Sequence, residues 1–336
     1  MNLSMPVVNT KTSLSKYRSE GLKRSELNDL LDFIELSYGD SMQVISDAIR
    51  GFLEADSGKR FIACDFSNIE GRVLAWIAGE RWKMNAFDDF DKGIGPDVYK
   101  LAASKIYNKS AKLITSQERQ VGKVAELALG YQGGVRAFQV MAKNYGVKIK
   151  DAEAESIKAA WRSSHPTVVS FWRDLEEAAM NAVKMQGITF TPGHRKIKFK
   201  TKGSFLWCSL PSLRVLCYPY PKIKDVEVPW GGTKPAVVYM AQDSMTKKWG
   251  ESTLYGGLLC ENVTQAIARD LLASAMLRLE KFNYPIVMHV HDEIVCEVEE
   301  GFGSVQEMKN IMCQNPLWAQ GLAVAAEGWS GRRYRK

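Results

Sequence analysis

The chain has 336 residues, enough for one large domain or two modest ones, and its 46% hydrophobic and 25% charged content is typical of a globular protein with a sizeable core. It has no apolar run long enough to span a membrane and no signal-peptide pattern at its start, so a cytoplasmic protein is expected. The six cysteines are scattered, which favours reduced thiols over a zinc site. The net charge of +7 is compatible with nucleic-acid binding but does not establish it.

Helical spacing of apolar residues recurs along much of the chain and predicts several helices. The first 55 residues are expected to form an N-terminal helical segment, with two helices between Ser25 and Phe52 that separate near Gly39. Thr115, followed three residues later by Glu118, predicts the N-cap of a basic helix that ends near Tyr131. The other helices expected are 69–78, 97–107, 152–163, 167–186 and 262–282.

Strands are expected in three places, which makes the fold class α+β. Residues 60–66 have the pattern of a buried strand, and 286–298 that of a strand, a tight turn and a strand. Between them, residues 187–240 contain several short strands interrupted by prolines. In this region Lys196–Lys200 alternates with period two, so one strand face is predicted to be basic.

Carboxylates stand at the ends of the first and last of these strand segments. Asp65 follows a buried strand, and Glu70 lies five residues later. His291, Asp292 and Glu293 lie between two apolar strands. An N-cap for Asp65 and a polar hairpin turn for Asp292 are the ordinary alternatives, and each acid alone leaves them open. Paired carboxylates are also the protein ligands of Mg²⁺ in phosphoryl-transfer sites.

A basic stripe lies between the two carboxylate segments in sequence. Arg119, Lys123, Leu127 and Tyr131 are four residues apart and therefore share one helical face. A solvated basic face is the ordinary explanation. The neighbouring positions are mostly apolar or small, however, which predicts a largely packed helix with this stripe as its exposed edge. An Arg fork and a Lys point charge suit a triphosphate.

Taken together, the three segments resemble motifs A, B and C of the family A DNA polymerases, the bacterial DNA polymerase I family. Asp65 to Arg72 (DFSNIEGR) is similar to D-[YF]-S-x-I-E-x-R, Arg119-x3-Lys123-x7-Tyr131 to the fingers helix, and Val290 to Glu293 (VHDE) to motif C. Bacteriophage-type members are nearer still, through Leu74–Glu80, Leu129–Gly134 and Glu261–Ala266. The likeness covers roughly residues 45–336.

The resemblance implies a right-hand fold with an antiparallel palm sheet and helical fingers. The palm would comprise residues 56–80 and 250–336, and the fingers with associated hairpins residues 81–249. Thumb and 3′–5′ exonuclease are not recognisable, because only 64 residues precede Asp65 and none forms the family's Thr-Gly-Arg segment. We therefore expect the C-terminal part of a split polymerase, with a separate chain that supplies the thumb and exonuclease.

The resemblance also implies a role for each residue of the motifs. Asp65, Asp292 and the Phe66 carbonyl would hold two Mg²⁺ ions, for which Mn²⁺ is a substitute, and Glu293 would be an auxiliary carboxylate. Catalytic Lys123 would bind the dNTP together with Arg119, Leu127 and Tyr131, and Glu70 would block a ribose 2′-hydroxyl. The residues expected to contact the primer–template DNA are His291, Gln265 and Arg72.

Three positions depart from the family pattern. Tyr99 stands where bacterial members often have a His that contacts phosphate. Leu127 stands where many members have Phe or Tyr, so its contact with the nucleotide sugar would be smaller. Leu213 replaces the Gly of a phage-type L-P-S-G-R segment at 210–214.

Template-directed DNA synthesis, in phage replication and in the cytoplasm of a bacterial host, is the function that these motifs predict. A single-subunit RNA polymerase is the first alternative, which Glu70 disfavours. A non-catalytic DNA-binding subunit derived from a polymerase is the second, which the intact Asp65, Asp292, Arg119 and Lys123 disfavour.

Overall fold

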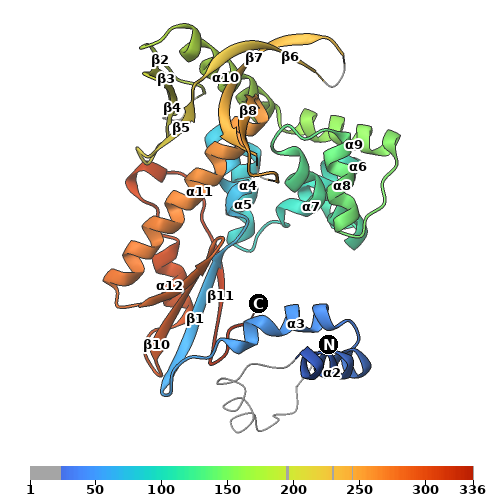
Figure 1. Ribbon diagram of the computed structural model, residues 1–336, viewed down its shortest axis with the longest axis vertical. Helices are drawn as coiled ribbons and strands as arrows, with labels where there is room; N and C mark the ends of the chain where they lie inside the picture. Colours follow the sequence, from blue (N-terminus) through green and yellow to red (C-terminus); the bar gives the residue numbers. More distant parts are fainter. Residues whose placement is uncertain (1–23, 194–196, 229–230, 244, 336) are drawn as a thin grey trace. The chain divides into compact units, whose positions relative to one another are not determined.

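The computed structural model describes residues 24–335 apart from 194–196, 229–230 and 244 (Figure 1). The chain divides into two compact units. One contains the described residues up to Phe61 together with those from Gly331 on, and the other is Ile62–Ser330. The second unit holds all of the predicted site residues, so the function is argued from it.

The first unit contains two helices, α2 (Arg24–Tyr38) and α3 (Ser41–Ala48), and a short 3₁₀ turn, η1 (Ile49–Phe52). Asp40 caps α3 by accepting from two backbone N–H groups at its start. The two helices predicted between Ser25 and Phe52 are therefore confirmed, while residues 1–23 of the predicted N-terminal segment lie outside the described part.

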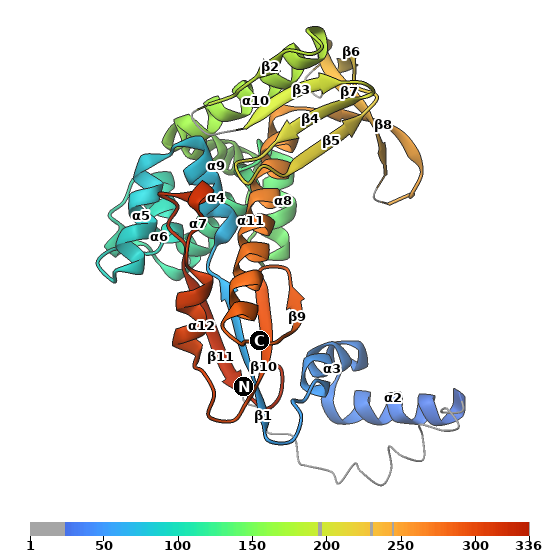
Figure 2. The same cartoon turned by 90° about the vertical axis from the view of Figure 1, so that its left-hand side faces the viewer.

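Helices make up nearly half of the second unit (Figures 1 and 2). They are α4 (Ile69–Ala78), α5 (Arg81–Asp91), α6 (Val98–Tyr107), η2 (Ala111–Leu113), α7 (Ser116–Leu129), α8 (Val135–Asn144), α9 (Asp151–Ser164), α10 (Pro166–Lys184), α11 (Gly256–Lys281), α12 (Val305–Met312) and η3 (Leu317–Ala319). All six helices predicted after residue 60 are found, and α11 begins earlier than expected. Sequence patterns missed α5, α8 and α12.

Three sheets complete the fold, as the prediction of an α+β class requires. The first has the strand order β11 (Ala326–Gly331), β1 (Lys59–Phe66), β10 (Glu293–Glu299) and β9 (Ile286–Val290). The second contains β2 (Thr189–Phe190), β3 (Lys198–Lys202), β4 (Phe205–Ser209) and β5 (Val215–Pro219) in chain order. The third contains β6 (Lys222–Glu227), β7 (Thr233–Gln242) and β8 (Trp249–Leu254).

The long helix α11 contributes many buried residues to the core of the second unit, and its first two positions are packed too tightly for a side chain. A Cβ on Gly256 would lie 2.2 Å from the carbonyl oxygen of Trp172, and a Cβ on Gly257 would lie 2.4 Å from that of Tyr131. The Trp172 indole also donates to the carbonyl of Gly130 at 3.0 Å. These close contacts fix the end of α7 against the start of α11. No helix among the described residues is long and apolar enough to cross a membrane.

Leu213, the residue that departs from the phage-type Gly, has a left-handed backbone with φ of 71° and is 83% exposed. A branched side chain in this region is strained by roughly 1–2 kcal/mol, and only Gly adopts it freely. We expect Leu213→Gly to raise the free energy of unfolding by about 1 kcal/mol, measured by urea denaturation. Leu213→Ala keeps the Cβ and is the matched control; equal stabilisation by both would contradict the explanation.

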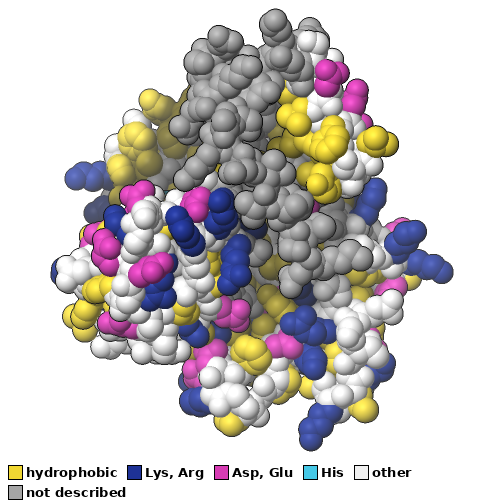
Figure 3. Space-filling model, turned by 90° about the horizontal axis from the view of Figure 1, so that it is seen from below, with side chains coloured by type: hydrophobic (Ala, Val, Ile, Leu, Met, Phe, Trp, Pro, Cys, Tyr) yellow, Lys and Arg dark blue, Asp and Glu magenta, His cyan; other side chains and the backbone are white. Residues whose placement is uncertain are grey.

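Charge is mixed on the face of the molecule shown in Figure 3. Where the surface is described, Lys and Arg side chains alternate with Asp and Glu side chains rather than forming one field. The net charge of +7 therefore does not indicate a nucleic-acid site on that face. Such a site has to be identified from particular side chains.

Candidate active site

The two predicted carboxylate segments lie side by side in the first sheet. β1 and β10 are neighbours, and the backbone N–H of Phe66 donates to the carbonyl of Asp292 at 3.3 Å. Asp65 therefore ends its strand next to the turn that carries Asp292. Both side chains are half-buried, with 21% of the Asp292 side chain exposed. Although these acids are 227 positions apart in sequence, the fold joins their two segments by a backbone hydrogen bond.

The turn between β9 and β10 has a left-handed backbone at His291, which determines the direction of its polar side chains. His291 has a φ of 56°, a left-handed conformation, and its Nδ1 lies 3.0 Å from Oδ1 of Asp292. Glu293 begins β10 and is buried, with 1% exposed. It pairs in register with Val290 across the hairpin. The tight turn predicted here is present, and it exposes His291 while it buries Glu293.

Glu70 links the two carboxylate segments to Tyr131, which follows the end of α7. Its Oε2 accepts from the Tyr131 hydroxyl at 2.7 Å, and its Oε1 lies 4.0 Å from Nε2 of His291. Burial, with the neighbouring Glu70 charge, raises the pKa of the Tyr131 phenol above its usual range, so this hydroxyl stays a donor. One carboxylate thus joins residues from all three sequence motifs, a connection that no single motif revealed.

Arg72 does not fit the DNA contact expected of it. Its side chain is buried, with 2% exposed, and its guanidinium donates to both carboxylate oxygens of Asp91 at 2.6 and 2.7 Å. Its Nε also donates to the carbonyl of Ser67 at 2.7 Å. A bidentate buried pair of this kind holds α4 to the end of α5 and supports the loop after Asp65. The role is structural because the guanidinium is fully engaged inside the protein.

Helix α7 carries the predicted basic stripe and begins with the predicted capping box. Thr115 and Glu118 each bond to the other's backbone N–H, which satisfies donors in the first turn. The helix can pack closely on α6 because residue 122 is Gly: a Cβ there would lie 2.2 Å from the carbonyl oxygen of Tyr99. The stripe is thereby held against the neighbouring helix.

The cations of this stripe have partners in the described structure. Arg119 donates to Asp97 at 3.1 Å, with its guanidinium 5.4 Å from the ring centre of Tyr99. The ammonium of Lys123 lies 5.1 Å from the Tyr145 ring centre. Leu127 is 37% exposed. Arg119 and Lys123 are only partly exposed, so an anion that binds here must compete with Asp97 for Arg119.

Helix α7 also carries Glu126, the centre of a buried charge network that the sequence patterns missed. Glu126 forms ion pairs with Lys83 of α5 and with His165, whose Nε2 lies 3.2 Å away, and it accepts from the Trp161 indole at 2.9 Å. The Trp161 and His165 rings stack with centres 3.9 Å apart. Burial acts to raise the pKa of the Glu126 carboxyl, but the charges of Lys83 and His165 outweigh it and hold that pKa far below its usual range.

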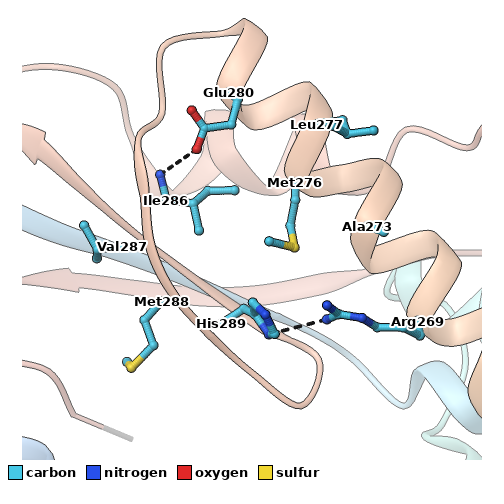
Figure 4. A pocket seen from close by; sticks show the side chains of 9 residues that line it. All are labelled: Arg269, Ala273, Met276, Leu277, Glu280, Ile286, Val287, Met288 and His289. Carbon is cyan, nitrogen blue, oxygen red and sulfur yellow. Dashed lines mark hydrogen bonds between the residues drawn. The ribbon is translucent and has the colours of Figure 1, made fainter.

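A groove of about 570 Å³ lies between α11 and the edge strand β9 (Figure 4). Arg269 and His289 face each other at one end, with Nη1 and Nδ1 3.4 Å apart. At the other end, Glu280 accepts from the backbone N–H of Ile286 at 2.9 Å. Gln265, predicted to contact DNA, lies one helical turn before Arg269 and therefore shares its face of α11. Sequence reasoning missed Arg269 and His289.

The site can be tested for its fit to divalent metal. Among the described residues no cluster of three or more His, Cys, Asp or Glu side chains could hold a metal ion. Mg²⁺ does not require such a cluster, because it usually keeps several waters and binds through one or two carboxylates together with substrate phosphates. Asp65, near the end of β1, and Asp292, in the turn beside it, are hard oxygen donors that meet that requirement once a triphosphate is present.

Cysteine chemistry has no part in this site. All six cysteines lie in the described part of the chain and are free. Burial raises the pKa of the Cys64 thiol, next to Asp65, to about 12, so it stays protonated and weakly nucleophilic.

The fold brings the acids, the basic helix and the turn together, and comparisons with known proteins identify the family. Residues 41–204 match the sequence profile of DNA polymerase family A. The chain is 38% identical over 307 residues to a DNA polymerase of Bacillus phage SP02, an alignment that covers 90% of this chain and 45% of that protein. The chain belongs to DNA polymerase family A.

Other relatives agree and show how much of such proteins this chain represents. Identity to the DNA polymerase I of Aquifex aeolicus is 31% over 119 residues, which is 35% of this chain and 20% of that protein. The fold is similar to the POL domain of Pol1 from M. smegmatis, solved in complex with a DNA primer-template and dNTP, with a TM-score of 0.55 and 17% identity over 85% of this chain and 42% of that one. The chain thus spans less than half the length of these relatives.

Proposed function

We propose that this chain carries the catalytic part of a template-directed DNA polymerase that adds dNTPs to a primer 3′-hydroxyl. The observation that carries the proposal is the bond from the Phe66 N–H to the Asp292 carbonyl, which joins the two carboxylate segments. Glu70 adds the third motif through Tyr131. Similarity to a phage DNA polymerase supports a role in phage replication within a bacterial host's cytoplasm.

In this proposal each residue acts on a defined part of the reaction. Arg119 and Lys123 bind the triphosphate, and Lys123 can donate a proton to the pyrophosphate as it leaves. Asp65, Asp292 and the Phe66 carbonyl would hold two Mg²⁺ ions, or Mn²⁺ in their place, with Glu293 as a nearby auxiliary carboxylate. When bound, the ions supply charge stabilisation for the attacking 3′-oxygen and the leaving pyrophosphate.

Residues around the new base pair would set its geometry. Leu127 of α7 and Tyr131 just beyond it would face the nucleotide, and His291 and Gln265 would contact the end of the primer–template. The palm would comprise residues 56–80 and 250–336, with the fingers and hairpins at 81–249.

Glu70 is expected to select against ribonucleotides, because its carboxylate would exclude a 2′-hydroxyl from the nucleotide site. Replacing Glu70 with Ala should increase kcat/KM for ribonucleotides relative to dNTPs by about 10- to 100-fold, which is the discrimination that a single contact in a substrate site provides. Single-nucleotide extension with each substrate measures this ratio. Tyr131→Phe, which removes only the hydroxyl that Glu70 accepts from, is the control. Unchanged selection in Glu70→Ala would contradict the assignment.

Primer extension with Mg²⁺ tests the whole proposal. The chain should extend a DNA primer on a DNA template, and a ribonucleotide product from an unprimed template would favour an RNA polymerase instead. Because the chain spans less than half of its relatives, the thumb and 3′–5′ exonuclease are proposed to come from another polypeptide region, such as a separate chain. Extension with and without proteins that co-purify from the native source tests that part: processive synthesis at physiological salt by this chain alone would refute it.

A further inference from the structure

The outer face of the second sheet carries lysines that the proposed catalytic site does not use. In β3, Lys198, Lys200 and Lys202 are exposed, while Phe199 and Thr201 between them are buried on the other face. Alternate residues of a strand lie about 6.6 Å apart on one face, so these three ammonium groups form a regular row. The sequence predicted a basic strand face here, of which Lys196 lies outside the described residues.

Aromatic side chains lie directly beside this row. Across the antiparallel ladder, Trp207 of β4 is opposite Lys200, and Phe205 is opposite Lys202. Both rings are partly exposed, and their centres are 5.3 Å apart. Tyr220, which is 55% exposed, continues the series with its ring centre 6.4 Å from that of Phe205. The Trp207 indole donates to the Lys202 carbonyl at 3.3 Å, which orients the ring.

The other face of this sheet is covered, so only the lysine and aromatic face is open. Leu206, Cys208 and Tyr218 are buried, and α10 lies along β2 and β3 (Figure 2). Strands β3, β4 and β5 contain no Asp or Glu, so no acidic residue of their own offsets the row of lysines. A face with positive charge and half-exposed aromatic rings complements a single-stranded nucleic acid, whose bases stack on the rings while its phosphates meet the cations.

The sheet is anchored to the helix that is proposed to contact the primer–template end. In the turn between β4 and β5, Ser212 and Arg214 bond to Asp270 of α11. From the buried face, the Tyr218 hydroxyl accepts from Asn262 of the same helix at 3.2 Å. Gln265 lies between these two anchors along α11. A nucleic-acid strand that leaves the region of Gln265 is therefore near a sheet held rigidly to that helix.

We propose that this outer face, formed by Lys198, Lys200, Lys202, Phe205, Trp207 and Tyr220, binds the unpaired DNA template ahead of the site of synthesis. The identity of the strand rests on the proposed function, whereas affinity for single-stranded DNA follows from the face itself. An acidic protein segment is the competing occupant. The row of flat aromatic rings favours DNA, because bases of any sequence stack on such rings.

Fluorescence anisotropy with two primer–templates tests the proposal. They share one duplex and differ in the 5′ template overhang, about 2 or about 16 nucleotides, the latter being the upper end of a typical single-strand site. Wild type should bind the long overhang more tightly. K198A/K200A/K202A and Trp207→Leu should each weaken only the long-overhang complex, by about 5- to 10-fold. The triple variant should also lower the salt slope by about 2.

A triple variant at exposed lysines elsewhere, K92A/K148A/K281A, removes the same charge and should leave the overhang preference intact. The proposal is overturned if wild type does not distinguish the overhangs, if both test variants keep the wild-type preference, or if they weaken both complexes equally. It is also overturned if the variants lose affinity for an acidic protein segment but keep the wild-type affinity for single-stranded DNA. Extension of the short-overhang primer is read separately: its absence in wild type defeats the proposed function, while binding still decides the role of this face.

Discussion

Asp292→Asn is expected to reduce primer extension by about 10³-fold or more, the largest effect on activity foreseen in this chain. The substitution keeps the size of the side chain and its contact with His291, and removes the charge that would hold a divalent ion. Metal stabilisation of transition-state charge amounts to several kcal/mol, and each 1.4 kcal/mol corresponds to a tenfold change in rate. Asp65→Asn should have an effect of similar size, because its strand adjoins the Asp292 turn.

The measurement is single-turnover extension of a labelled primer with Mg²⁺, with DNA affinity determined in parallel. Affinity should change little, so that the loss lies in kcat rather than in binding. Glu300→Gln is the matched control, since it removes an exposed carboxylate just beyond β10 and should leave the rate unchanged. If Asp292→Asn extends primers as fast as wild type, the catalytic role proposed for Asp292 is refuted.

Local signals in the sequence predicted local structure well. The capping box at Thr115 and Glu118 is present, and α4 has the predicted bounds of 69–78, with Gly79 in a left-handed conformation at its end. Each depends on residues within one or two turns, whose preferences are set by backbone hydrogen bonding. The predicted hairpin around Asp292 is also confirmed, since β9 and β10 pair antiparallel. Two apolar strands that flank a short polar turn are a strong local signal for a hairpin.

What the sequence could not predict depends on distant partners. Arg72 was assigned to DNA from its place in a motif, and its actual partner, Asp91, is 19 residues away on another helix. Glu126 was overlooked because a single acid on a helix gives no sign of a buried charge network. Its partners, Lys83 and His165, are distant in sequence and reach it only through packing. The same is true of the bond between Glu70 and Tyr131, 61 residues apart, which connects the motifs into one site.

The largest effect on stability is expected at Glu126, whose charge balances two buried cationic or polar groups. The side chains of Lys83 and His165 are 2% and 0% exposed. Glu126→Gln leaves them without a counter-charge, and breaking a buried pair costs about 3–5 kcal/mol. Urea denaturation should show a lower midpoint with an unchanged slope. Glu177→Gln, an exposed acid on α10, should change stability by less than about 0.5 kcal/mol.

The same network predicts how stability depends on pH. Because the folded-state pKa of Glu126 is held below its unfolded value of about 4.3, its contribution is fully present above that pH and is lost as the pH falls towards the folded pKa. Wild type and Glu126→Gln should therefore differ most at neutral pH and converge on acidification. The double variant Lys83→Met, Glu126→Leu removes both charges of the ion pair and should recover much of the lost stability, because apolar replacements of a buried pair are often neutral or stabilising. A Glu126→Gln protein as stable as wild type at pH 7 would show that this buried charge does not hold α7 in place.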